Sequence, residues 1–97
     1  AIARDPELFD ARLNYGKVLT LQNRLPAALE QFEVATRLAP DAFQAWNNCA
    51  AIHDAFGRGR EAIAAAERAV AAAAARQAPE VAVLRERLAG YRRKWGG

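Results

Sequence analysis

Residues 12–40 read RLNYGKVLTLQNRLPAALEQFEVATRLAP, and this stretch decides the fold. It holds two runs of helix-forming residues, separated by a turn at Asn23 and closed by Pro40. A small residue, Gly16, stands in the first run, and a large aromatic residue, Phe32, stands in the second. The pattern predicts two helices that pack antiparallel, because the connection between them is short.

The same pattern returns 34 residues further along the chain. Identical pairs at this offset include Pro6 and Pro40, Asn14 and Asn48, Arg24 and Arg58, Ala28 and Ala62, Glu33 and Glu67, and Ala35 and Ala69. The turn residue Asn23 falls on Gly57, which is also a turn-forming residue. So many matches at one offset indicate an internal repeat, built from one helix-turn-helix unit.

Each copy keeps a different part of a known repeat pattern, W-x₂-L-G-x₂-Y…A-x₃-F…P. The first copy keeps the glycine, the phenylalanine and the proline, at Gly16, Phe32 and Pro40. The second copy has Trp46 at the tryptophan position. Over residues 9 to about 74 the chain therefore resembles the tetratricopeptide repeat family.

The resemblance implies an all-α fold, in which antiparallel helix-turn-helix repeats stack as a short right-handed α-solenoid of about five helices. We expect these helices at residues 6–21, 25–38, 42–56, 59–77 and 80–95. The whole chain, 1–97, is expected to form a single domain. Its parts are a remnant or lead-in of a preceding repeat at 1–8, repeat 1 at 9–42, repeat 2 with an extended second helix at 43–78, and a capping helix with a basic tail at 79–97.

Composition limits the class of protein. Apolar residues make up 53% of the chain and the mean hydropathy is -0.19, as in soluble globular domains. The longest apolar run, Ala69–Ala75, is too short to span a bilayer, so we expect no membrane insertion. The single cysteine, Cys49, excludes an internal disulfide and leaves the compartment open, with the cytoplasm favoured.

The net charge of +3 is unevenly placed along the chain. Residues 1–75 carry eight basic and nine acidic side chains, whereas residues 76–97 carry six basic and two acidic ones. The stretch YRRKW, at 91–95, offers cations and rings that could contact nucleic acid or an anionic surface. Basic groups also stabilise a helix C-terminus, and this simpler interpretation makes a nucleic-acid partner an unlikely one.

Cys49 and His53 are the only residues of their types, and they lie four apart on the third predicted helix. This spacing places them on one helix face, as a nucleophile pair or half of a metal site would require. A zinc site needs three or four ligands, and the chain holds no further cysteine or histidine. We expect both residues to pack against helix 59–77. The sequence therefore predicts no enzyme activity, no metal and no cofactor.

In the tetratricopeptide family, the first helix of each repeat packs on its partner helix with one face and lines a concave groove with another. The resemblance assigns Tyr15 and Leu19 to the packing face. It assigns to the groove, from the first copy, Asp10, Leu13, Asn14, Lys17, Thr20 and Leu21, and from the second copy Gln44, Asn47, Asn48 and Asp54. Arg87, in the last helix, is a possible cationic contact at the same groove.

Asn14 and Asn48 are the sharpest candidates among these positions, because they lie one repeat apart. A side-chain amide offers both a donor and an acceptor, so it can bind a peptide unit through either group. Two such amides could hold an extended chain without recognising its side chains. The incomplete set of groove cations, with Lys17 in the first copy, argues against a strong carboxylate site.

The sequence thus predicts a protein–protein interaction module, a scaffold or adaptor that binds a peptide or helix of a partner in the groove. Two other classes stay open. The chain could be a structural or self-association element of a larger multidomain protein, with a possible homodimer. The third and least favoured class is a protein that binds nucleic acid or anionic surfaces through its basic tail.

Overall fold

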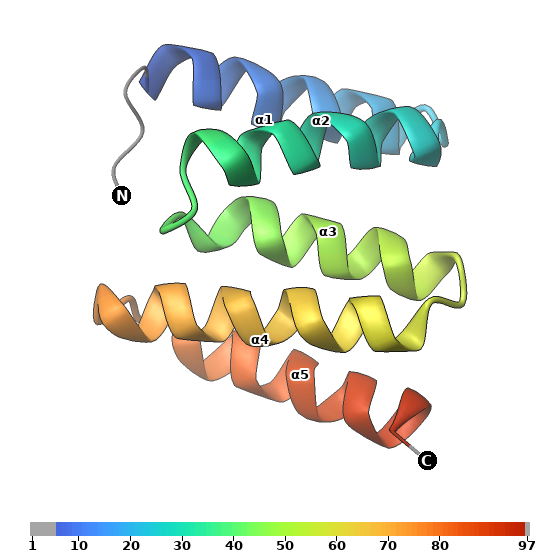
Figure 1. Cartoon of the computed structure of the whole chain (residues 1–97), viewed down its shortest axis with the longest axis vertical. Coiled ribbons are helices and arrows are strands. Elements are labelled where there is room, and N and C mark those ends of the chain that lie inside the picture. Colours follow the sequence, from blue (N-terminus) through green and yellow to red (C-terminus); the bar gives the residue numbers. More distant parts are fainter. Residues whose placement is uncertain (1–5, 97) are drawn as a thin grey trace.

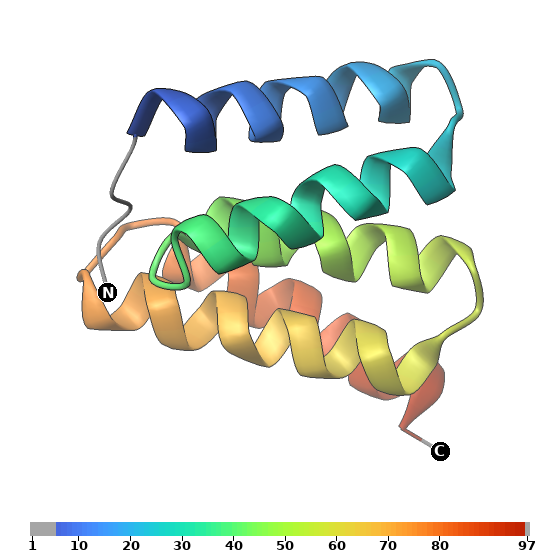
Figure 2. The same cartoon turned by 45° about the horizontal axis from the view of Figure 1, so that its top comes forward.

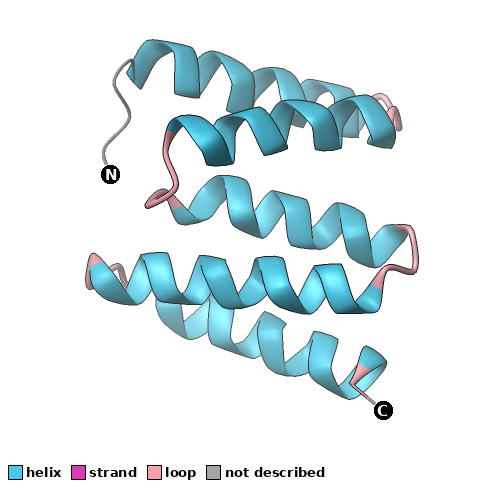
Figure 3. Ribbon diagram, in the orientation of Figure 1, coloured by secondary structure: helices cyan, strands magenta, loops and turns pink. Residues whose placement is uncertain are grey.

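The structure is a computed structural model that describes residues 6–96, and there it consists of five α-helices without a strand (Figures 1 and 3). The helices are α1 at Pro6–Leu21, α2 at Leu25–Leu38, α3 at Phe43–Ala55, α4 at Gly59–Ala75 and α5 at Val81–Trp95. The predicted all-α class is confirmed, with boundaries that differ by at most two residues. The predicted lead-in at 1–8 falls mostly outside the described residues.

Each helix packs against the next one in the chain, from α1 on α2 through to α4 on α5. In the view of Figure 1 the helices follow one another in the order of the sequence from α1 to α5. Figure 2 shows that α5 lies behind α4. The molecule measures 39 × 32 × 17 Å along its principal axes. None of the described helices combines the length and the apolar character that crossing a membrane requires.

Three helices end with the same hydrogen-bonding scheme. At the end of α1, the Asn23 amide donates to the Thr20 carbonyl and the Arg24 amide donates to the Leu19 carbonyl. The ends of α3 and α4 repeat these bonds one for one, at residues 53–58 and 73–78. The scheme needs a left-handed residue, and Asn23, Gly57 and Gln77 have φ values of 59°, 74° and 54°. The first two positions are 34 residues apart, so these two turns share the period of the sequence.

The contact between α1 and α2 depends on the missing side chain of Gly16. A Cβ atom at Gly16 would lie only 2.6 Å from Cε1 of the Phe32 ring. Phe32 is 1% exposed, so its ring is enclosed and cannot move aside. The two helices therefore approach closely because the glycine leaves room for a large ring.

The fourth helix is built almost entirely of small residues on its buried sides. All of its buried residues are alanines, namely Ala62, Ala65, Ala66, Ala69, Ala72 and Ala73. Small side chains let neighbouring backbones approach closely, and α4 packs on both α3 and α5. On the side of α5, Ala69 and Ala73 form a separate core with Leu84.

The C-terminal end of α5 docks against the start of α4. The Trp95 side chain lies directly on Gly59, where a Cβ atom would overlap it. Its indole Nε1 donates a hydrogen bond of 2.8 Å to Asp54 of α3. The C-terminal end of α5 is therefore fixed to both α3 and α4.

Replacing Gly16 by alanine should lower the free energy of unfolding by about 1–2 kcal/mol, because overpacking in a closed core outweighs the higher helix propensity of alanine. Gly90 in α5 is the matched control, since the nearest atom to an added Cβ lies 3.8 Å away. The Gly90→Ala variant should gain up to about 1 kcal/mol. Urea unfolding of both variants measures the difference. Equal effects of the two substitutions would contradict the close contact.

Candidate functional site

An open hollow of about 400 Å³ lies between α1, α2 and α3. Its lining residues are Lys17, Thr20 and Leu21 of α1, Phe32 of α2 and Asn48 of α3. Five residues from three helices thus meet here. All but Phe32 are predicted groove residues, with Asn48 from the second copy of the repeat and the others from the first. The hollow is mainly apolar, with one cation, one amide and one hydroxyl at its edges.

The floor and one wall of this hollow are fixed by the same contact that holds α1 on α2. The Phe32 ring reaches the hollow because Gly16 leaves room for it. The Thr20 hydroxyl donates a bond of 2.8 Å to the Gly16 carbonyl, which holds that side chain against its own helix. The site therefore has a rigid base.

Two of the three polar groups at the edge of the hollow, those of Lys17 and Asn48, are unpaired in the described chain. Within residues 6–96, neither the Asn48 amide nor the Lys17 ammonium takes part in a hydrogen bond or ion pair. Asn48 is half-buried, whereas Lys17 is exposed. A half-buried amide without a partner is well placed to bind a ligand. Because burial has already removed part of its hydration, a ligand has less bound water to displace.

Other predicted positions on α1 lie elsewhere. Leu13, assigned to the groove, is 8% exposed and belongs to the main core, so this assignment is wrong. Tyr15, assigned to the packing face, is 51% exposed. Asn14 is exposed and does not line the hollow with Asn48. Burial of a large aliphatic side chain stabilises the fold by roughly 1.5–3 kcal/mol, which explains why Leu13 turns inward.

The remaining predicted positions of the second copy are held by α5, apart from Gln44, which is exposed at the start of α3. Asn47 Oδ1 accepts a bond of 3.3 Å from Arg87. Asp54 Oδ1 accepts from Lys94 at 3.0 Å and from the Trp95 indole. The structure thus divides the predicted groove into an unpaired half at Lys17 and Asn48, and a half that contacts the capping helix.

These contacts change the acidity of Asp54. The hydrogen bonds from Trp95 and Lys94, and the charge of Lys94, lower the pKa of the Asp54 carboxyl below its ordinary value of 3.8. Partial burial acts in the opposite direction but does not prevail. Ionised Asp54 therefore fastens α5 to α3.

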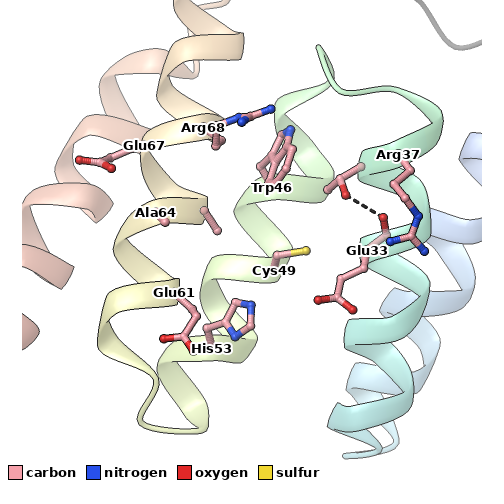
Figure 4. A pocket seen from close by; sticks show the side chains of 11 residues that line it. Glu33, Arg37, Trp46, Cys49, His53, Glu61, Ala64, Glu67 and Arg68 are labelled. Carbon is pink, nitrogen blue, oxygen red and sulfur yellow. Dashed lines mark hydrogen bonds between the residues drawn. The ribbon is translucent and has the colours of Figure 1, made fainter.

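A second hollow, of about 590 Å³, lies between α2, α3 and α4 and was not foreseen from the sequence. Figure 4 shows Trp46, Cys49 and His53 of α3 along its floor. The guanidinium of Arg68 stacks over the Trp46 ring at 4.6 Å, and the indole Nε1 donates to the Pro40 carbonyl at 2.9 Å. The only hint in the sequence is the run of small residues in α4, which leaves space beside the ring.

The structure gives Cys49 and His53 different surroundings. Cys49 is buried, as predicted, and burial together with the charge of Glu33 raises the pKa of its thiol to about 12. The thiol is therefore protonated at neutral pH, a form that is not nucleophilic. His53 is half-buried, and its Nδ1 is buried without a hydrogen-bond partner in the described chain. Among residues 6–96, no three acidic, histidine or cysteine side chains are grouped to hold a metal ion.

Comparison with known proteins identifies no family. No family model matches the chain, and no match was found among curated proteins or among solved structures. Residues 6–96 form five α-helices, each packed on its neighbours in the sequence, and α1, α3 and α4 end in the same turn.

The free energy of unfolding should fall as the pH drops from about 5 to below the lowered pKa of Asp54. The sign follows because a depressed carboxyl pKa stabilises the fold above the unfolded pKa, and this contribution is lost as the folded carboxyl takes up a proton. An Asp54→Asn variant should be less stable than the parent at pH 7 and show a smaller loss in acid. Urea unfolding at several pH values measures both.

Glu30→Gln is the matched control, since Glu30 is exposed and forms no ion pair within the described residues. Its pH profile should run parallel to that of the parent. If Asp54→Asn ran parallel as well, the contact between α5 and Asp54 would have no energetic role.

Proposed function

We propose that the chain is a tetratricopeptide-type module of stacked helix-turn-helix repeats, and that it binds an extended peptide or a helix of a protein partner in the hollow between α1, α2 and α3. The observation that carries the proposal is the hollow itself. It joins Lys17 and Asn48, from corresponding helices of the two repeats, over the buried ring of Phe32. The role is that of a scaffold or adaptor without enzymatic activity.

The family assignment draws its support from two independent features. The first is the sequence pattern with its 34-residue period. The second is the geometry at matching positions, where Asn23 and Gly57 adopt the same left-handed turn and Gly16 accommodates the Phe32 ring. The residues that define the sequence repeat are therefore the residues that form the matching turns and the close helix contact.

The hollow suggests the chemistry of the bound segment. The apolar base formed by Phe32 and Leu21 suits one apolar side chain. The Asn48 amide can donate to a peptide carbonyl and accept from a peptide N–H. Lys17 favours an acidic side chain at the open edge. The expected ligand is therefore an extended segment with one apolar anchor followed closely by an acidic residue.

The larger hollow supports the proposal less well. Arg68 already covers the Trp46 ring at 4.6 Å, and Glu67 beside it pairs with Arg92 at 2.8 Å. The protonated thiol of Cys49 offers no catalytic nucleophile. Arg68 and Glu67 of this hollow are thus engaged within the chain, whereas Lys17 and Asn48 of the smaller hollow are not.

Selection of a displayed random peptide library on the immobilised full chain tests the proposal. Peptides enriched on the parent should share an apolar residue next to an acidic one. Their affinity should fall at least about tenfold for Asn48→Ala and for Lys17→Glu, since each removes or reverses a direct contact. Fluorescence anisotropy with a labelled selected peptide measures these losses.

Asn14→Ala is the matched control, because it removes the corresponding amide of the first repeat, which lies away from the hollow. It should leave the affinity within about twofold. Selected peptides that bind all three variants as tightly as the parent would place the site elsewhere and contradict the proposal.

A further inference from the structure

The exposed apolar side chains of the molecule are concentrated on one helix. Of the five large apolar residues that stand exposed in the described chain, only Val83 lies outside α1, and the others are Leu8, Tyr15, Val18 and Leu21. Helix α1 is the edge of the molecule and packs mainly on α2 (Figures 1 and 2). Exposed apolar residues clustered on one helix are typical of an interaction surface.

Four residues of α1 form a continuous stripe on this face. Leu8, Ala11, Tyr15 and Val18 follow one another at intervals of three, four and three residues, the spacing of a helix-pairing seam. All four are exposed. Buried Leu13 and Gly16 lie on the opposite side of the helix from Ala11 and Val18, whereas buried Leu19 borders the stripe one turn after Tyr15. The stripe is also separate from the Lys17 side that borders the hollow of the proposed function.

We propose that this stripe pairs with the same stripe of a second copy of the chain, with the two α1 helices antiparallel about a two-fold axis. The order of side chains makes the stripe complementary to itself. In the antiparallel register Leu8 faces Val18 of the second copy, and small Ala11 faces large Tyr15, so that each ring meets a gap. The inference does not depend on the function proposed above.

The polar residues beside the stripe suit the same arrangement. Asn14 lies beside the two-fold axis, where its amide meets the amide of the second copy, and each can donate to the other. The cation closest to the axis, Arg12, is turned toward α2, because its Nη1 donates to Gln31 Oε1 at 2.8 Å. Like charges are therefore kept away from the centre of the contact. One pair of short helices gives a small interface, so the dimer should be weak and concentration-dependent.

Sedimentation velocity from about 10 μM to about 1 mM tests the proposal, because a small contact associates in this range. The parent should pass from monomer to dimer. Val18→Glu should raise the dissociation constant at least tenfold. Val83→Glu is the matched control, since this valine on α5 is similarly exposed, at 52% against 47%, and it should leave the dissociation constant within about twofold. A parent that stays monomeric at the highest concentration, or equal effects of the two variants, would overturn the proposal.

Crosslinking tests the orientation separately. In a Cys49→Ala background, a short bismaleimide should join two copies of the Asn14→Cys variant, whose side chains meet at the axis. It should not join two copies of Leu21→Cys, which lie about 24 Å apart along the antiparallel helices. Equal crosslinking at both positions would indicate parallel helices, and crosslinking at neither would exclude this contact. Circular dichroism checks that every variant is folded.

Discussion

The Phe32 ring lying against Gly16 is the contact on which the rest of the structure depends. It sets the distance between α1 and α2, because a single methyl group at Gly16 would overlap the ring. The same ring forms the base of the hollow that joins α1 to α3. Its near-complete burial makes the contact rigid, so it holds Thr20 and Lys17 at a constant position relative to Asn48. The stability of the first repeat and the shape of the candidate site thus have one origin.

The second repeat solves the same packing problem with different residues. Where the first repeat places Phe32, the second places Ala66, and α4 as a whole buries alanines. Alanine side chains let α4 pack closely on its neighbours, so no ring is needed to fill the space between them. On its other side α4 is covered by α5, where Ala69 and Ala73 contact Leu84. The fastening of α5 requires Trp95 on Gly59 and two donors on Asp54, so groove positions of the second copy are used for folding. Among the polar residues of α3, Asn47 and Asp54 hold α5, whereas Asn48 lines the candidate site.

Much of this fold was predictable from the sequence, because helix ends and small-residue positions are local signals. The 34-residue period, the turn at Gly57 and the close helix approach at Gly16 all follow from the spacing of residue types, but the Phe32 ring as the neighbour of Gly16 does not. The burial and the partners of individual side chains could not be predicted from the sequence. Leu13 and Tyr15 exchanged their expected places, because burial on α1 depends on which helices surround it. The pairing of Asp54 with Trp95 joins residues far apart in the chain, and no local spacing indicates it.

A double-mutant cycle on Gly16 and Phe32 tests the central contact most directly, because it isolates the interaction between the two side chains. Gly16→Ala, Phe32→Leu and the double variant are compared by urea unfolding. If the ring causes the cost of the alanine, Gly16→Ala should become at least about 1 kcal/mol less destabilising in the Phe32→Leu background, and the two substitutions should not add. Additive effects within about 0.5 kcal/mol would contradict the contact as the basis of the fold and of the site.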